Sequence, residues 1–407
     1  MTAQSTTPAG IHLPPNFKII EVDGKIRKQP TTDPTPPLGV LSNFSGAFTG
    51  HGFNLIFRPN SGPPTGTTFP NPISPPAPTP PSQNALELNL TTEMLTFSKS
   101  IGSIPNRGLE SQSDIFLNGV PYMQVINDVT NPSTGKANGT ATGIHFEPGL
   151  WMHVPATTSD PIIGESLVRM ASIPHGTTIN AQCLQPTKTF SGPPTFAPVD
   201  PTPFVIGSNP PKLIPFAAQT ASNTSTPRIP QDLTKFIAEG TITQDILTDP
   251  NTVLRNAIKG QNITSTIVFT VDTTPTAPEL GGGTANIGFL VGASSGSVTG
   301  PNANAVDMSA TFWIETVEHK ITIPVFKPGQ QPLKIAAPAS QPGAPTPTFL
   351  VNPPKEITEP ITITVTSTQI QYSQKVILNF AGLSWPHISV ATLVPGSDLE
   401  VPNPVFH

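Results

Sequence analysis

The segment Gly143–Pro155, GIHFEPGLWMHVP, holds the richest set of chemically active side chains in the chain. If it forms a strand, His145 and Glu147 lie on one face, because side chains two residues apart point the same way. Beyond the Pro-Gly break, Trp151 and His153 share a face again. A histidine beside a carboxylate can act as an acid/base pair or a metal ligand, or line a pocket for an aromatic ligand. The alternative is a strand edge whose histidines bond backbone carbonyls.

Other positions carry weaker signals. His175 lies in a turn, S-I-P-H-G, which either faces solvent or looks into the mouth of a barrel. Arg107 beside Gly108 either recognises a carboxylate or stabilises a turn. Cys183 is the single cysteine and stands in a strand-like run, so we expect a small core residue there. The sequence contains no G-x-S-x-G, H-E-x-x-H or C-x-x-C motif, which disfavours the common hydrolase and zinc chemistries.

Glycines follow an unusual pattern near the start of the chain. In the segment Asn43–Pro59, Gly46, Gly50 and Gly52 recur at even offsets, with Phe48 between them. On a strand these positions share one face. Glycines on one face leave it open to a group that approaches the backbone closely.

Composition limits the class of protein that can hold these residues. The 407 residues include 53 prolines and 32 glycines; 11% are charged, 36% are hydrophobic and the net charge is -5. So few charges exclude long helical bundles, and this apolar content argues against disorder throughout. The near-neutral charge predicts no nucleic-acid partner and no membrane partner. No secretory signal or membrane-spanning run is visible, so we expect a cytoplasmic protein.

Short runs rich in β-branched and apolar residues alternate with Gly, Pro and Asn, which predicts strands in an antiparallel arrangement. We expect strands at 43–59, 85–97, 113–117, 121–128, 142–155, 165–173, 177–184, 262–271, 285–291, 308–325, 361–369, 372–380 and 387–394. Short helices are expected at 231–239 and 249–259, the second with Asp249 as its N-cap.

The predicted fold class is mainly β: an antiparallel calycin-like β-barrel, enlarged or duplicated, with Pro-rich loops and one or two short helices. Whether the chain makes one barrel or two stays open. The expected divisions are an extended arm (1–38), a first barrel portion (39–190), a second β portion or insertion with short helices (191–326), a Pro-rich linker (327–360), barrel-closing strands (361–397) and a tail (398–407).

Three short motifs, in this order, resemble the nitrobindin-like haem-binding β-barrels, which are related to the lipocalins. Gly46–Gly52 is similar to the family's G-x-W-x-G-x-G opening, with Phe48 in place of Trp, and Gly143–Trp151 is similar to its mid-barrel H-x-E-x-G-x-W strand. Tyr372 followed by the segment Trp385–Leu393 resembles its closing hairpin. The resemblance implies haem as the cofactor and His387 as the iron ligand. It also implies a haem-binding wall formed by Gly46, Phe48, Gly50, Gly52, Trp151 and His153.

Three functions are therefore open, and the sequence does not decide whether the protein is an enzyme. The first is a barrel that binds haem or a similar flat apolar molecule, with haem-iron redox or reactive-nitrogen chemistry at His387. The second is a cofactor-free isomerase or cyclase of an apolar metabolite, in which His145 and Glu147 form the acid/base pair. The third is a structural surface or coat protein whose Pro-rich arms wrap neighbouring copies in a homo-oligomer.

Overall fold

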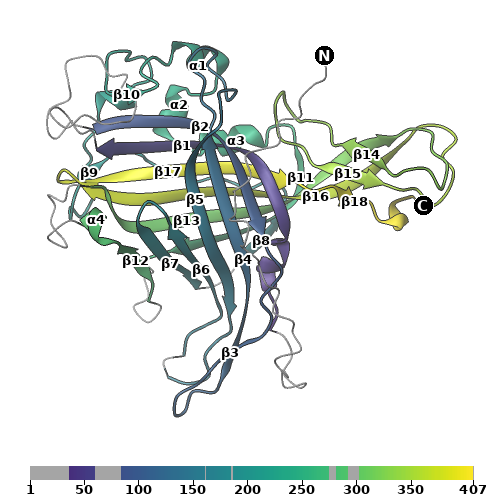
Figure 1. Ribbon diagram of the computed structural model, residues 1–407, viewed down its shortest axis with the longest axis horizontal. Coiled ribbons are helices and arrows are strands. Elements are labelled where there is room, and N and C mark those ends of the chain that lie inside the picture. Colours follow the sequence, from purple (N-terminus) through teal and green to yellow (C-terminus); the bar gives the residue numbers. More distant parts are fainter. Residues whose placement is uncertain are drawn as a thin grey trace, which may run out of the picture. The chain divides into compact units, whose positions relative to one another are not determined.

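The structure, a computed structural model, describes residues 36–59, 84–160, 162–184, 187–274, 281–291 and 302–406. Nearly all of the predicted N-terminal arm (1–38) and of the Pro-rich tract that follows the first strand lies outside these residues. Within them the protein is mainly β, with a few short helices, as predicted (Figure 1).

Ten of the described strands close into one antiparallel barrel. Around the barrel they follow the order β2 (Asn84–Phe97), β1 (Gly46–Pro59), β17 (Leu383–Pro395), β16 (Ile361–Phe380), β13 (Asn304–Ile323), β11 (Asn262–Asp272), β7 (Thr177–Leu184), β6 (Ser166–Ile173), β5 (Thr142–Val154) and β4 (Ile115–Asp128). The ring closes where β4 pairs with β2. Both halves of the chain thus build a single barrel, which answers the question that the sequence left open.

The opening and closing segments of the chain pair directly with each other. In the ladder of β1 and β17, Gly50 lies opposite Leu393 and Gly52 lies opposite Ala391. A barrel that closes in this way leaves no unpaired edge between its first and last strands. The barrel-closing strands expected at 361–397 thus include β17, which pairs with the glycine-rich strand β1.

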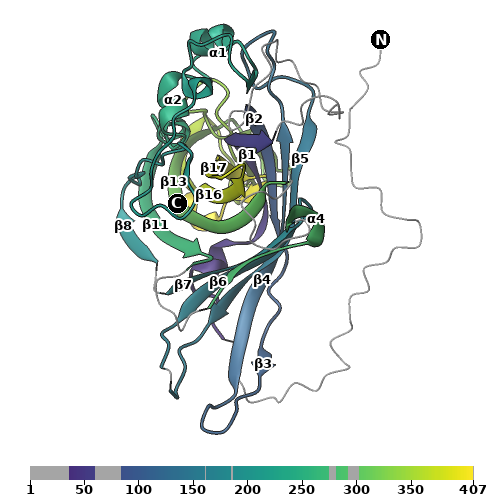
Figure 2. The ribbon, with the colours of Figure 1, turned by 90° about the vertical axis from the view of Figure 1, so that its left-hand side faces the viewer.

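Alternation along the strands separates an inner core from an outer one. In β1, Phe48 points into the barrel, whereas Phe53, Leu55 and Phe57 point outward. The outward side chains pack against a layer that contains α1 (Thr234–Glu239), α2 (Gln244–Thr248) and α3 (Thr252–Ala257). Figure 2 shows α1 and α2 outside the barrel wall.

The remaining described elements are short. Between the N-terminus and the helical layer they are η2 (Gly39–Asn43), β3 (Ile104–Asn106), β8 (Lys188–Ser191), β9 (Phe204–Val205), η3 (Ala217–Gln219) and β10 (Arg228–Ile229). Towards the C-terminus they are β12 (Gly283–Asn286), α4 (Gly288–Val291), β14 (Leu333–Ala336), β15 (Thr348–Val351), β18 (Leu399–Glu400) and η5 (Asn403–Phe406).

A third core lies where β13 and β16 extend past the barrel. There Ile321, Ile323 and Ile363 pack with Phe349 and Val351 of a three-stranded sheet, β14-β15-β18 (Figure 1). The segment 327–360, expected as a linker, therefore contains two strands. Its prolines flank these strands and leave them free to pair.

Several boundaries differ from the sequence-based expectation. The two strands expected at 113–117 and 121–128 form the single strand β4, because the φ angle of Pro121 suits an extended chain. The two expected at 361–369 and 372–380 likewise form β16. The strand expected at 285–291 divides into β12 and α4. The helix α3 begins at Thr252, and the carboxylate of Asp249 instead bonds Arg255 and the backbone N–H groups of Asn251 and Val199.

Candidate functional site

One half of the barrel interior is filled by aromatic rings. This aromatic half comprises Phe44, Phe48, Phe97, Trp151, Phe269 and Phe312. The short helix η2 brings Leu41 and Phe44 into it, and the ring of Phe44 stacks on that of Phe97 with centroids 4.5 Å apart. Leu41 is completely buried. The chain thus covers this half of the interior with its own apolar side chains.

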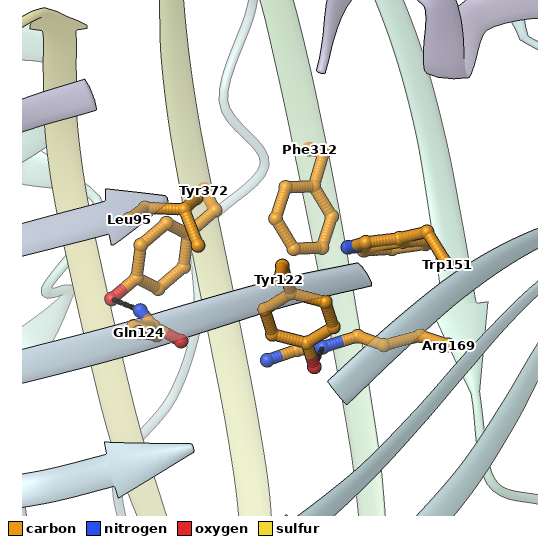
Figure 3. Close-up of a pocket in the computed structure, with 7 residues that line it drawn as sticks. All are labelled: Leu95, Tyr122, Gln124, Trp151, Arg169, Phe312 and Tyr372. Atoms are coloured by element: carbon orange, nitrogen blue, oxygen red, sulfur yellow. Dashed lines mark hydrogen bonds between the residues drawn. The ribbon is translucent and has the colours of Figure 1, made fainter. Parts of the chain in front are cut away.

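A small cavity lies between the aromatic half and a polar half (Figure 3). The space open to the centre of a water molecule is about 10 Å³, which is close to the minimum for one water. It is lined by Leu95, Tyr122, Gln124, Trp151, Arg169, Phe312 and Tyr372. The polar groups of this lining lead directly into the hydrogen-bond network of the polar half.

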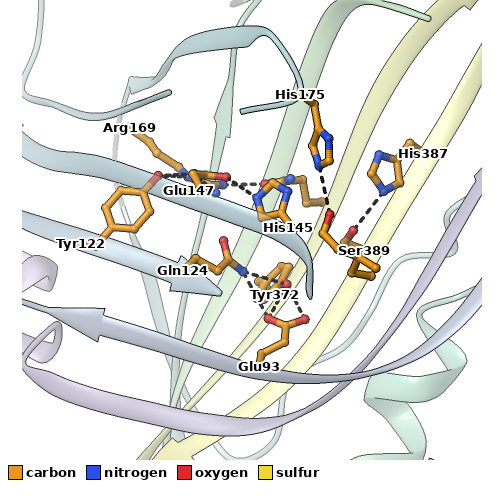
Figure 4. Close-up of polar contacts among 12 residues, drawn as sticks. Glu93, Tyr122, Gln124, His145, Glu147, Arg169, His175, Tyr372, His387 and Ser389 are labelled. Carbon is orange, nitrogen blue, oxygen red and sulfur yellow. Dashed lines mark hydrogen bonds and ion pairs between the residues drawn. The ribbon is translucent and has the colours of Figure 1, made fainter. Parts of the chain in front are cut away.

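Glu147 is the centre of that network (Figure 4). Its Oε1 accepts a hydrogen bond from Arg169 at 2.7 Å and another from the hydroxyl of Tyr122, and its side chain is completely buried. Burial opposes ionisation of Glu147, but the Arg169 charge and the hydrogen bonds from His145 and Tyr122 outweigh it and lower the pKa to about 2. Glu147 is therefore a carboxylate at any physiological pH.

Arg169 is held as firmly as Glu147. It donates to Gln374 at 2.7 Å and to the oxygen of Tyr122 at 2.9 Å. The guanidinium carbon lies 5.6–5.8 Å from the ring centroids of Tyr122, Trp151 and Phe312. An ion pair that is this well hydrogen-bonded can stay charged inside a barrel.

The pKa of Glu93 is raised, whereas that of Glu147 is lowered. The hydroxyl of Tyr372 lies 2.7 Å and 2.9 Å from its two oxygens, and Gln124 donates to it at 3.2 Å. Burial without a directly paired cation raises the pKa of Glu93 to about 7, although these hydrogen bonds lower it in part. This hydrogen-bond network thus contains Glu147, which is a permanent carboxylate, and Glu93, which gains or loses a proton near neutral pH.

His145 lies beside Glu147 and is the partly exposed member of the pair. Its Nε2 lies 3.1 Å from Oε2 of Glu147, and its side chain is 15% exposed, whereas that of Glu147 is buried. The pair expected from sequence therefore faces inward and lies within hydrogen-bond distance. Because the carboxylate can only accept, Nε2 of His145 carries the proton and Nδ1 presents a lone pair.

Two further histidines lie at the same end. The His175 ring is 5.7 Å from that of His145, and its Nε2 donates to the backbone oxygen of Ile144. On β17, Nε2 of His387 lies 2.6 Å from the amide nitrogen of Asn54 and 3.5 Å from the hydroxyl of Ser389. We call this end, bounded by Asn54, Asn89, His145, His175 and His387, the polar end.

His387 remains neutral in this setting. Burial, followed by the charges of His145 and His175 when protonated, lowers the pKa of His387 to about 3. The amide nitrogen of Asn54 donates to Nε2, so the lone pair of this nitrogen is already used. Asn54 also donates to Ser389 at 2.8 Å, which ties β1 to β17 at this level.

The side chains as they stand do not fit haem. Asn54 uses the Nε2 lone pair of His387, and the cavity next to Trp151 has room for about one water molecule, far less than a porphyrin needs. Among the described residues, no group of three or more His, Cys, Asp or Glu side chains could hold a metal ion. Haem binding at His387 stays a prediction.

The glycines on β1 have a different neighbour from the one that the resemblance implies. A Cβ atom at Gly50 would overlap the backbone oxygen of Thr392, and one at Gly52 would overlap that of Val390. The glycines therefore allow β17 to approach β1 closely. Gly46 lies at the start of the strand with a φ of +72°, a conformation that suits glycine.

Three of the expected site side chains, those of Phe48, Trp151 and His153, lie away from the polar end. Trp151 belongs to the aromatic half, and the ring of His153 pairs with Glu165, with its Nε2 2.6 Å from the carboxylate. A Cβ atom at Gly39 in η2 would lie 3.9 Å from His153, so this histidine lies beside η2 and not at the polar end. The structure thus brings together His145, Glu147 and His387, but not His153.

Other sequence signals have structural explanations. Arg107 pairs with Asp114 at 2.5 Å at an exposed turn, and the N–H of Gly108 bonds the same carboxylate. Cys183 is buried in the interior core, as expected. Among described residues, no helix has the length and apolar character needed to cross a membrane.

Sequence reasoning missed Glu93, Arg169 and Asn54. A usable signal existed for Arg169, which is the one charged residue of the apolar strand β6, SLVRMASI. A charged side chain in such a run is almost always paired when it is buried. The residue that pairs with it could not be read from the sequence, because it lies on the neighbouring strand.

The chain was compared with protein-family models, curated proteins and solved structures, and none of them matched. The likeness to nitrobindin-like barrels therefore stays a prediction that rests on three short motifs.

Proposed function

We propose that the protein is a cofactor-free enzyme that moves a proton on a small molecule, in the manner of an isomerase or cyclase. His145 is the general base and acid, Glu147 holds it in position, and the substrate enters at the polar end. The function predicted from sequence as an alternative is thus the one that the geometry favours.

The contact between His145 and Glu147 carries this proposal. Its 3.1 Å distance directs the Nε2 proton to the carboxylate and leaves the Nδ1 lone pair for a substrate proton. A nucleophile or base that is oriented by a third group is the arrangement common to many acid/base sites. Arg169 and Tyr122 keep Glu147 ionised, so the carboxylate can stabilise the imidazolium that forms when His145 accepts a proton.

Accessibility supports the same assignment. His145 is partly exposed at the polar end, whereas the carboxylates behind it are buried. We therefore place substrate entry at the exposed side of His145. Glu93, with its pKa of about 7, is suited to exchange a proton at neutral pH within the same interior.

The base can be tested with a substrate that needs only proton removal. In 5-nitrobenzisoxazole, loss of the C–H proton to a base opens the ring and releases a coloured phenolate, which is followed by absorbance. We expect the wild-type protein to catalyse this elimination faster than free imidazole at the same concentration. His145→Gln should lose about 100-fold or more, the usual contribution of a positioned base.

A matched control separates this effect from a general loss of histidine. His51 is exposed on the outer face of β1, so His51→Gln should retain the wild-type rate. Circular dichroism confirms that each variant is folded. If His145→Gln is folded and as active as the wild type, the proposal is wrong.

Haem binding remains a second candidate, because His387 faces into the barrel as the resemblance implies. It requires Asn54 to release Nε2 and the aromatic side chains to move apart. A haem-reconstituted sample tests it: a Soret band that His387→Ala changes would support haem binding, and its absence would reject it. The cytoplasmic location likewise stays a prediction.

A further inference from the structure

We infer that His387 is a second catalytic residue, which donates a hydrogen bond to the carbonyl oxygen of a neutral substrate while His145 removes a proton from the adjacent carbon. This inference rests on the proposed function and adds to it the class of substrate, an uncharged carbonyl compound. It follows from the hydrogen bonds that surround the two imidazoles.

His387 carries its proton on Nδ1. The amide nitrogen of Asn54 lies 2.6 Å from Nε2 and donates to it. A neutral imidazole has one N–H and one lone pair, so the proton must be on Nδ1. The lone pair that accepts this hydrogen bond exists only on the neutral ring, and the lowered pKa of His387, about 3, agrees with this. His387 is therefore a fixed hydrogen-bond donor through Nδ1.

The Nδ1–H group of His387 has room for an acceptor. No described residue accepts a hydrogen bond from Nδ1 of His387, and the side chain is only partly buried. A donor without an acceptor among the described residues is suited to an acceptor on a bound molecule. A carbonyl oxygen is such an acceptor.

The two imidazoles are complementary. Glu147 makes His145 present a lone pair, whereas Asn54 makes His387 present an N–H group. Figure 4 shows both rings at the same end of the network. A base and a neutral donor placed together are what removal of a proton next to a carbonyl group requires, since charge develops on the oxygen as the proton leaves.

Charge limits the substrate further. Two arginines lie on inward-facing strand positions of the described barrel, and both are in ion pairs: Arg58 with Glu87 at 3.0 Å, and Arg169 with Glu147 at 2.7 Å. The described interior therefore offers no uncommitted arginine to bind a carboxylate or phosphate. An uncharged carbonyl compound fits this balance.

The reaction step is balanced without any other reagent. Nδ1 of His145 takes the proton from the carbon next to the carbonyl group, and the C–H bond breaks. The electron pair of the C–H bond forms a C=C bond, and the π electrons of the C=O group move to the oxygen. The product is an enolate, whose oxygen accepts the hydrogen bond from His387. The imidazolium of His145 then returns the proton to a carbon of the conjugated system, which yields an isomer.

A phenolate tests the donor directly, because its oxygen resembles that of an enolate. We would titrate the full-length protein with 4-nitrophenol, whose ionised form absorbs in the visible. We expect the wild type to bind the phenolate about 10- to 100-fold more tightly than His387→Phe does, the range for a hydrogen bond to a charged group. His387→Asn keeps an N–H group and should recover part of that affinity.

Two further measurements guard against misfolding and misassignment. His51→Phe, on the outer face of β1, should bind the phenolate as the wild type does. In the unmutated protein, ¹⁵N NMR of the histidine rings should show the proton of His387 on Nδ1. Equal phenolate affinity in a folded His387→Phe variant, no phenolate binding by the wild type, or a proton on Nε2 would each overturn the inference.

The two proposals fail separately. If elimination of 5-nitrobenzisoxazole does not depend on His145, the proposed function is lost. If the elimination does depend on His145, but wild type and His387→Phe bind 4-nitrophenolate equally well, only the role of His387 and the carbonyl substrate class are lost.

Discussion

Glu93 and Glu147 face the same barrel interior, yet their environments shift their pKa values in opposite directions. Glu147 has a cation at 2.7 Å, and its pKa falls to about 2. Glu93 has only uncharged donors, and burial raises its pKa to about 7. Groups whose pKa values diverge in this way divide acid and base roles between them.

The raised pKa of Glu93 predicts a specific dependence of stability on pH. Its ordinary pKa is 4.5, so between about pH 4.5 and 7 the folded protein holds a proton that the unfolded chain has lost. The contribution of Glu93 to stability is therefore full below pH 4.5 and is lost as the pH rises to 7. The variant Glu93→Gln, which cannot ionise, should gain stability relative to the wild type between pH 5 and pH 8.

Urea unfolding at the two pH values measures this difference. Glu359→Gln, at an exposed position, serves as the control, and its difference from the wild type should not change with pH. A Glu93→Gln difference that is the same at pH 5 and pH 8 would contradict the assignment of Glu93 as a group that titrates near neutral pH.

At this scale the sequence predicted His145 and Glu147 as a pair because both lie on one strand, two residues apart. It could not predict Arg169, Glu93 or Asn54 as partners, because each comes from a different strand and depends on register. A shift of one residue would turn all of these side chains to the other face of the sheet.

Among the elements, the close contact of β1 with β17 explains the even spacing of the glycines. At Gly52 a Cβ atom would meet the backbone oxygen of Val390, as well as Thr91 at 2.8 Å and Glu93 at 2.9 Å. The backbone oxygen cannot move without displacing the strand. Glycine at this position therefore allows both the close approach of β17 and the observed position of the Glu93 side chain.

Gly52→Ala should accordingly destabilise the protein by about 1–3 kcal/mol, the usual cost of overpacking. It should also disturb Glu93 and lower the elimination rate. Gly143→Ala is a suitable comparison, because the nearest atom to its Cβ would be Oδ1 of Asn127 at 3.7 Å, an ordinary contact. Denaturant unfolding of both variants measures the effect, and equal stabilities would show that the close approach is unimportant.

Most strands were predicted because alternation and β-branched residues are local signals. The pair of strands β14 and β15 was missed because the prolines around them dominate the composition of 327–360. The short helix α2 was missed for a similar reason, since its five residues carry too little periodicity to be recognised.

In the whole molecule, the barrel has two different ends. The aromatic half is filled, in part by Phe44 of the segment that precedes β1, and the polar end carries the three histidines. The proposed function assigns substrate entry to the polar end. The closed barrel was predicted from composition and from the order of the motifs, but the filling of its interior depends on side-chain packing that a single sequence does not reveal.

Phe44→Ala tests whether the segment before β1 is part of the folded barrel. It removes a ring that stacks on Phe97 and lies 5.5 Å from the ring of Trp151, so it should destabilise the protein by about 3–5 kcal/mol. Phe289→Ala removes a ring that is 57% exposed and should cost far less. Thermal unfolding compares the two. A Phe44→Ala variant as stable as the wild type would mean that the segment before β1 does not contribute to stability.

The most direct test of acid/base chemistry at the polar end is the ratio of kcat/KM for 5-nitrobenzisoxazole between the wild type and His145→Gln. If the carboxylate-held imidazole removes the proton, this ratio is about 100 or more. A ratio near one, measured on folded protein, would contradict the account.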